Sequence, residues 1–257
     1  MGGVLIDIDG VLTVSWQPLP GAVPAFRQIR DAGVALALLT NTTSRTRASI
    51  AGALTEAGFP VHPEDIHTAP TVTASYLAAH HPGARCLLLN SGDIREDLGN
   101  VTLVEDDPDV VLVGGAGEEF DYPALNRIFG ELRRGARLIA MHRNLYWRTS
   151  AGLRLDTGAF LVGLEHAARV RAEVVGKPSA AFFDTAVAGL GIAPDQALMI
   201  GDDIDADVLA AQRRGITGVL VRTGKYLPET HAAAEADPDH VLDSFADLPA
   251  LLERLGS

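Results

Sequence analysis

The stretch Val4-Leu5-Ile6-Asp7-Ile8-Asp9-Gly10 decides the fold of this chain. An apolar run that ends in Asp and Gly predicts a short buried β-strand followed by a turn. Residues two apart on an extended segment point to the same face, so the carboxylates of Asp7 and Asp9 are expected to converge beyond the strand. Two such carboxylates repel each other unless a cation or a shared proton lies between them. A plain strand-ending turn would explain the same residues, and this stretch alone leaves both interpretations open.

The same order of strand, loop and helix continues along the chain. Strands are predicted at residues 4–8, 34–39, 85–89, 110–113, 137–141, 173–175, 197–200 and 217–221. Helices are predicted at residues 22–32, 44–57, 122–134, 159–168, 180–190 and 206–214. This alternation indicates an α/β fold with a parallel sheet, in which functional side chains gather at the carboxyl ends of the strands. Because the candidate site residues lie in the outer sections, we expect residues 1–77 and 173–257 to form one core, with residues 78–172 inserted as a cap.

Composition narrows the class of protein. The 257 residues include 21 Lys and Arg against 33 Asp and Glu, a net charge of −12, which argues against general nucleic-acid binding. No apolar run approaches the roughly 18 residues that span a bilayer, so no membrane association is expected. The single cysteine and the absence of a basic leader predict a cytoplasmic protein. Lys177 and Lys225 are the only lysines. Genomic codon bias is the favoured explanation of their rarity, and the alternative is that each lysine kept in an arginine-rich chain marks a place that needs a compact charge.

Three further motifs follow predicted strands. The stretch 201–207, Gly-Asp-Asp-Ile-Asp-Ala-Asp, holds four carboxylates, more than the capping of a helix requires, and favours a hard cation such as Mg²⁺. Thr40-Asn41 precedes a helix and offers donors for an anion, although helix capping would explain it equally well. Lys177 lies in a Gly-Lys-Pro turn, where a phosphate oxygen would be a suitable partner.

In this order, Asp-x-Asp-Gly, Thr-Asn, Gly-Lys-Pro and Gly-Asp-Asp resemble the four motifs of the haloacid dehalogenase-like (HAD) phosphohydrolases. The resemblance covers the whole chain and implies a Rossmann-like parallel-sheet core with an inserted α/β cap of the C2 type, as in subfamily IIA. It further implies a Mg²⁺-dependent phosphatase that hydrolyses small phosphate esters through an aspartyl-phosphate. Pyrophosphate and phosphoamino acids are among the expected substrates.

The resemblance also assigns roles to the acidic residues. Asp7 is expected to be the nucleophile, and Asp9 to protonate the leaving group and then to take a proton from water. Mg²⁺ is expected on Asp7, on the backbone carbonyl of Asp9 and on Asp202. Asp203 and Asp207 are expected to support these ligands from outside the coordination sphere.

Phosphate binding and specificity are assigned to other residues. Thr40, the backbone N–H of Asn41 and Lys177 are expected to hold the phosphoryl oxygens. A polar and aromatic cluster in the cap is expected to meet the leaving group, although its aromatic members could simply pack the cap; this cluster comprises His142, Arg143, Asn144, Tyr146 and Trp147.

Alternatives stay open at this point. A non-catalytic module that binds a phospho-ligand or a protein is the competing function, and a phosphonate or carbon–halogen hydrolase is the competing enzyme. The expected partner is a small phosphorylated metabolite, and the resemblance suggests dimerisation through the cap. Relatives of this chain often carry serine in place of Asp9, so an acid here predicts stronger hydrolysis of phosphomonoesters with poor leaving groups.

Overall fold

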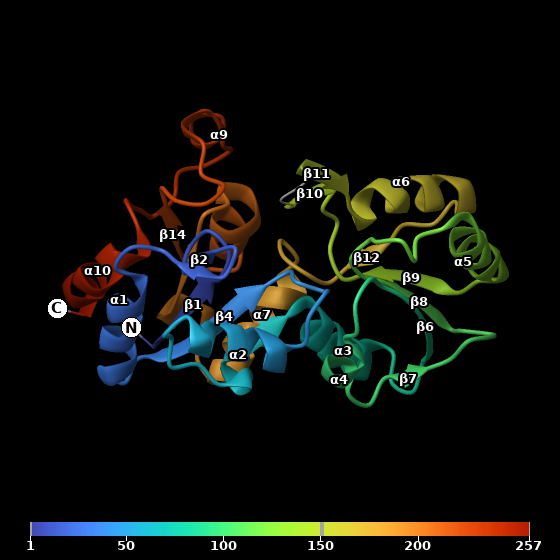
Figure 1. Ribbon diagram of the computed structural model, residues 1–257, viewed down its shortest axis with the longest axis horizontal. Coiled ribbons are helices and arrows are strands. Elements are labelled where there is room, and N and C mark those ends of the chain that lie inside the picture. The colour runs from blue at the N-terminus through green and yellow to red at the C-terminus, as the bar shows by residue number, and fades with distance from the viewer. Residues whose placement is uncertain (1, 150–151, 257) are drawn as a thin grey trace. The chain divides into compact units, whose positions relative to one another are not determined.

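The computed structural model describes residues 2–149 and 152–256 and divides the chain into two compact units (Figure 1). The core unit comprises Met1–Thr40, Arg47–His67 and Lys177–Ser257, and the cap unit comprises Asn41–Thr46 and Thr68–Gly176. The long stretch of the cap unit therefore begins before helix α3 (Ala69–His80), whereas residues up to 77 were expected in the core. Thr68 explains this position, because it caps α3 and its Oγ1 donates to Asp97 Oδ2 at 3.2 Å inside the cap unit.

The core unit is built on a sheet with the order β15-β14-β13-β1-β4-β5. The pairs from β15 through to β4 are parallel, which confirms the predicted α/β class with a parallel sheet. Its strands are β1 (Gly3–Asp7), β4 (Ala35–Thr40), β5 (Ile66–Thr68), β13 (Ala197–Gly201), β14 (Thr217–Val221) and β15 (His240–Leu242). A short hairpin of β2 (Thr13–Val14) and β3 (Gln17–Pro18) follows β1.

Helices cover the core sheet because its strands are apolar on both faces. One face packs against α1 (Ala22–Asp31), α2 (Arg47–Glu56) and α10 (Leu248–Gly256). Val4 and Ile6 of β1 belong to this cluster and are fully buried. Helix α7 (Ala180–Leu190) packs against β4 and against the short helix α8 (Ala210–Gln212). This packing holds the strands, and therefore the residues at their carboxyl ends, in fixed register.

The cap unit has its own sheet, with the order β12-β9-β8-β6-β7, and all of its pairs are parallel. Its strands are β6 (Arg85–Leu89), β7 (Thr102–Leu103), β8 (Val110–Val113), β9 (Arg137–Ala140) and β12 (Glu173–Val174). A separate hairpin joins β10 (Tyr146–Thr149) to β11 (Gly152–Leu155). Its helices are α3, α4 (Arg95–Leu98), α5 (Tyr122–Arg134) and α6 (Thr157–Ala168).

The structure corrects one predicted helix and adds several elements. The predicted helix at residues 206–214 is a π-helical segment, Ile204–Leu209, followed by the single turn of α8. Both hairpins, β5, α3, α4, β7, α9 (Pro228–Ala232), β15 and α10 were not predicted. Most of these are too short for hydrophobic periodicity to reveal them.

No helix in the described part of the chain is long and apolar enough to cross a membrane.

Candidate active site

The sheet register brings three of the predicted motifs together. Strand β1 lies between β13 and β4, with Ile6 paired to Ile200 and Asp7 paired to Leu39. Asp7 therefore ends the central strand, Thr40 ends its neighbour on one side, and Asp202 follows Gly201 on the other side. All three side chains are buried. This arrangement agrees with the expectation that functional side chains gather at the carboxyl ends of parallel strands.

Three carboxylates gather at this edge. Asp7, Asp202 and Asp207 can each offer one oxygen such that all three oxygens lie within 4.8 Å of one another. Asp7 is 5% exposed, and Asp202 and Asp207 are each 2% exposed. Asp207 thus lies in this cluster, and its expected role in supporting the metal ligands stays a prediction. Its position follows from the π-helical segment, which begins directly after Asp203 and turns Asp207 back toward β13.

Lys177 partly neutralises the carboxylate cluster. Its Nζ lies 2.5 Å from Asp7 Oδ1 and 2.7 Å from Asp207 Oδ1, and the side chain is 6% exposed. Burial alone would lower the pKa of Lys177, but the carboxylates of Asp207 and Asp7 outweigh this effect and raise its pKa. The ammonium group therefore stays charged beside the expected nucleophile, Asp7, at neutral pH. The prediction from the Gly-Lys-Pro turn placed a compact charge here.

The cluster still carries excess negative charge, and its pKa values reflect that. Burial, with the nearby Asp7 and Asp207 carboxylates, raises the pKa of Asp202 to about 8. Burial also raises the pKa of Asp207 to about 6, although Lys177 opposes the change. The Oδ1 atom of Asp202 is buried without a hydrogen-bond partner among the described residues. Hard oxygen donors, an unpartnered buried carboxylate oxygen and uncompensated negative charge fit Mg²⁺.

Asp9 stands apart from this cluster. It lies beyond the end of β1, next to a bridge to Thr13 at the start of the hairpin, and its side chain is exposed. Its carboxylate is not one of the three whose oxygens lie within 4.8 Å of one another, and the convergence of the Asp7 and Asp9 carboxylates stays a prediction. The chain turns after Asp7 instead of staying extended. Desolvation raises the pKa of Asp9, opposed by the charges of Lys225 and Lys177.

A loop that we did not assign to the site closes over Asp202. Lys225 N donates to Asp202 Oδ2 at 2.7 Å, and Thr223 Oγ1 donates to the carbonyl of Gly10 at 2.5 Å. The loop begins directly after β14, so its place at a strand end was the available signal, as was the rarity of lysine. The charges of Asp7 and Asp202 act on the Lys225 ammonium and raise its pKa, against the opposing effect of desolvation.

Asp203 supports the cluster through the backbone. Its side chain accepts hydrogen bonds from Asp205 N at 3.1 Å and from Ala206 N at 2.9 Å, which caps the π-helical segment. Its own backbone N donates to Asp207 Oδ2 at 3.4 Å. Asn41, the partner of Thr40 in the predicted anion cradle, belongs to the cap unit, so its role toward phosphate stays a prediction.

The predicted specificity residues of the cap differ in their environment. His142 is 3% exposed, and burial lowers its pKa although Asp156, 3.9 Å away, opposes the shift. Arg143 forms an ion pair with Glu165, and its NH1 donates to Glu165 Oε1 at 2.9 Å. Asn144 contributes its carbonyl, which accepts from Gly158 N at 2.8 Å.

The two aromatic residues of that cluster lie on β10. Tyr146 is 60% exposed, so it is not packed inside the cap unit. The side chain of Trp147 lies outside the described part of the structure. Contact of this cluster with a substrate stays a prediction.

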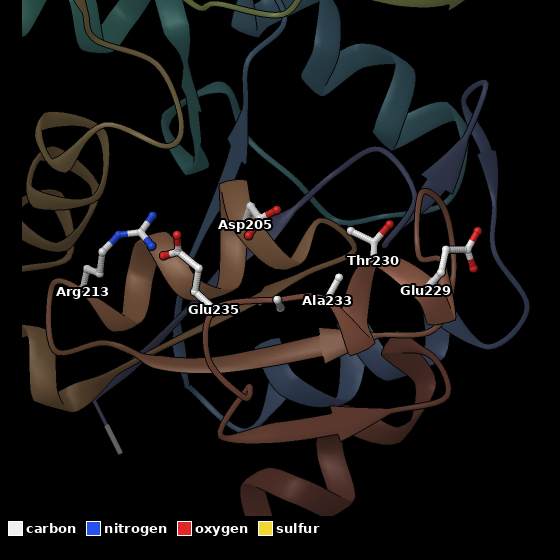
Figure 2. A pocket seen from close by; sticks show the side chains of 7 residues that line it. Asp205, Arg213, Glu229, Thr230, Ala233 and Glu235 are labelled. Carbon is white, nitrogen blue, oxygen red and sulfur yellow. The ribbon is translucent and has the colours of Figure 1, made fainter.

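Two hollows lie on the core unit. A hollow of about 610 Å³ is surrounded by side chains that include Asp205, Glu229, Glu235 and Arg213 (Figure 2). Its three carboxylates against one guanidinium would repel a phosphate dianion. A smaller one of about 80 Å³ is lined by residues that include Asp202 and Lys225. The smaller hollow thus lies beside the carboxylate cluster, through Asp202.

Comparison with known proteins decides the family. A haloacid dehalogenase-like hydrolase model matches residues 4–103, and a second HAD hydrolase-like model matches residues 174–248. The phospholysine phosphohistidine inorganic pyrophosphate phosphatase of Xenopus laevis is 38% identical over 95% of this chain and 91% of that protein. This chain belongs to the haloacid dehalogenase-like hydrolases. The human haloacid dehalogenase-like hydrolase domain-containing protein 2 is 36% identical over 94% of this HAD hydrolase and 92% of its own length.

Solved structures agree with this family. The p-nitrophenyl phosphatase of Archaeoglobus fulgidus is 26% identical, with a TM-score of 0.91 over 97% of this HAD hydrolase and 98% of that chain. The glycerol phosphate phosphatase of Mycobacterium tuberculosis, in complex with magnesium, is 29% identical, with a TM-score of 0.87 over 96% of this chain and 76% of that one. The predicted family, fold and enzyme class, a HAD-family phosphatase, are confirmed.

Proposed function

We propose that this HAD hydrolase is a Mg²⁺-dependent phosphatase that cleaves small phosphate esters through an aspartyl-phosphate on Asp7. One observation carries the proposal. Asp7 ends the central strand with its Oδ1 2.5 Å from the Lys177 ammonium, and it shares a buried cluster with two further carboxylates. A buried carboxylate beside a fixed positive charge is suited to attack phosphorus, because the cation offsets charge on the transferring oxygens.

The reaction has two steps. In the first, an Asp7 carboxylate oxygen forms a bond to phosphorus while the bond from phosphorus to the leaving oxygen breaks, and Asp9 gives its proton to that oxygen. In the second, Asp9 takes a proton from water, whose oxygen attacks phosphorus and releases Asp7 and phosphate. Desolvation raises the pKa of Asp9, which favours the protonated form that the first step needs.

Asp7, the backbone carbonyl of Asp9 and Asp202 would hold Mg²⁺, with Asp207 available in the same cluster. Bound there, the cation would offset the charge of the carboxylates and of the phosphoryl oxygens, so that the Asp7 carboxylate and the phosphate group of the substrate could approach each other. Lys177 keeps Asp7 and Asp207 in place from the protein side, since its Nζ contacts both. Thr40 ends the neighbouring strand and is proposed to bind a phosphoryl oxygen, as is the backbone N–H of Asn41.

The substrate is proposed as a small phosphorylated metabolite. Two groups of relatives support a phosphatase: proteins named for phospholysine, phosphohistidine and inorganic pyrophosphate, and structures named for nitrophenyl or glycerol phosphate. A non-catalytic module that binds a phospho-ligand is the alternative. The buried Lys177–Asp7 pair favours catalysis, because simple anion binding does not require a buried carboxylate beside the anion. Dimerisation and a cytoplasmic location stay predictions.

The test is hydrolysis of p-nitrophenyl phosphate by the whole chain. We expect turnover with Mg²⁺, none in EDTA, and a loss on the order of 10³-fold or more in Asp7→Asn, which lacks the nucleophile but keeps the shape. When the reaction with a ³²P-labelled phosphate ester is quenched in acid, the wild-type protein should carry the label and Asp7→Asn should not. Activity that survives EDTA or Asp7→Asn would contradict the proposal, and binding of phosphate without any turnover would favour the alternative.

A further inference from the structure

Asp202 is held in a fixed rotation by one loop. Its Oδ2 accepts the backbone N–H of Lys225 at 2.7 Å, while its Oδ1 is buried and has no partner among the described residues. One oxygen of this carboxylate is thus satisfied by the protein and the other is available to a ligand. The donor is a backbone group, so its position depends on the conformation of the loop and not on the Lys225 side chain.

Two glycines let this loop approach Asp202. Gly224 has φ +61° and Gly10 has φ +86°, both in the region that favours glycine. A methyl group at Gly224 would overlap with Asp202 Oδ2 and would lie 2.5 Å from the Cα atom of Gly10. A methyl group at Gly10 would likewise overlap with Asp202 Oδ2 and would lie 2.9 Å from the Cα atom of Gly224. The two backbones and the carboxylate therefore form one contact in which no side chain fits.

Thr223 ties the two sides of this contact together. Its Oγ1 donates to the Gly10 carbonyl at 2.5 Å, so the loop after β14 is bonded to the turn after β1. That turn directly follows Asp7 and contains Asp9. The loop therefore connects the segment that carries Asp7 and Asp9 with the carboxylate of Asp202.

We propose that Thr223-Gly224-Lys225 is a positioning loop that orients Asp202 toward the metal and sets the affinity for Mg²⁺. This rests on the proposed metal-dependent phosphatase and adds a function for residues outside its motifs. Free rotation of the carboxylate would have to be lost on metal binding, and the loop removes that freedom in advance. Partners of metal ligands of this kind change metal affinity by about 10- to 100-fold when they are removed.

Gly224→Ala tests the close approach, and Gly215→Ala is its matched control. Gly215 also has a positive φ, +80°, but a methyl group there meets nothing within 4 Å. Both variants carry the strain of a positive φ, and Gly224→Ala carries the close contact with Asp202 and Gly10 in addition, so its melting temperature in EDTA is expected to fall further than that of Gly215→Ala. Calorimetric titration with Mg²⁺ alone should show affinity at least about tenfold weaker in Gly224→Ala and within about twofold of wild type in Gly215→Ala. Equal effects in the two variants would overturn the proposal.

Thr223 gives a second variant pair that changes less of the backbone. Thr223→Val keeps the shape but removes the O–H donor, whereas Thr223→Ser restores the donor. We expect weaker Mg²⁺ binding in Thr223→Val, by up to about tenfold, and near wild-type binding in Thr223→Ser. Unchanged affinity in Thr223→Val would overturn the role of this hydrogen bond.

Amide hydrogen exchange separates this proposal from the proposed function, because it needs no metal. Lys225 lies in an exposed loop, so slow exchange of its amide in EDTA would report the bond to Asp202. We expect slow exchange in wild type and fast exchange in Gly224→Ala and in Asp202→Ala. Fast exchange in wild type would overturn the positioning loop even if Mg²⁺ binds. Slow exchange without any binding of Mg²⁺ would instead overturn the proposed Mg²⁺ dependence of the enzyme. The role of the loop in metal affinity would then be wrong as well.

Discussion

At the scale of single residues, Asp7 and Asp9 have different surroundings, which suit the two roles proposed for them. Asp7 is buried against Lys177, whereas Asp9 lies in the turn beyond the strand and is exposed. A carboxylate held beside an ammonium group is suited to be the nucleophile. A carboxyl group with a raised pKa at the edge of the site is suited to transfer protons.

Asp9→Ser tests this division. The variant removes the proton donor, so turnover of an alkyl phosphate should fall by about 10²–10⁴-fold. Turnover of p-nitrophenyl phosphate should fall less, because p-nitrophenolate leaves without a proton from the enzyme. Steady-state kinetics of wild type and Asp9→Ser with both substrates measures the loss of turnover for each. A fall of less than about tenfold with the alkyl phosphate would show that Asp9 is not the general acid.

At the scale of elements, the strand ends and the segments that follow them build the site. β1 supplies Asp7, β4 supplies Thr40, and the segment after β13 supplies Asp202, Asp203 and Asp207. The last of these segments is π-helical over Ile204–Leu209, which is a rare form that occurs often at functional sites. Asp203 starts it by accepting two backbone N–H groups.

Asp203→Ala should therefore destabilise this segment. Loss of the cap is expected to lower the free energy of unfolding by about 1 kcal/mol, and Asp203→Asn should retain most of it because the amide oxygen still accepts. Denaturant unfolding in EDTA measures both variants. An Asp203→Ala protein as stable as wild type would show that the segment does not depend on this cap.

At the scale of the whole molecule, the buried carboxylates couple folding to pH. Asp202 has a pKa of about 8 in the folded chain, raised by burial from an ordinary value of 3.8. Between these two values the folded chain binds more protons than the unfolded chain at this group. The contribution of Asp202 to stability is therefore greatest at low pH and is lost as pH rises through about 8.

Asp202→Asn removes this dependence. In EDTA at about pH 8 we expect the variant to be more stable than wild type by about 1 kcal/mol or more, with a smaller difference at about pH 5. Excess Mg²⁺ should raise the melting temperature of wild type more at the higher pH, since the cation replaces the proton. Thermal unfolding at the two pH values provides the measurement. The same change in stability with pH in wild type and in Asp202→Asn would contradict the raised pKa of Asp202.

Much of the fold and the site could be predicted because local chemistry specifies it. The apolar run before Asp7 could only form a buried strand, and Lys177 in a Gly-Lys-Pro turn had no packing role to explain it. What local patterns could not predict depends on backbone shape. A π-helical segment brings Asp207 into the carboxylate cluster, and the chain turns directly after β1, where Asp9 is exposed. Short elements such as the β2–β3 hairpin lack the length that periodicity needs.

The sequence by itself determined the class of sheet, the motifs at its strand ends and the family, because these depend on residue type and order. The tertiary structure alone decided which polar atoms of distant residues form hydrogen bonds with one another. Contacts such as Lys225 N to Asp202 Oδ2, or Thr223 Oγ1 to the Gly10 carbonyl, join residues that are 23 and 213 positions apart. Such contacts depend on sheet register and on two glycines in close approach, which are set by packing across the whole core and not by any local pattern.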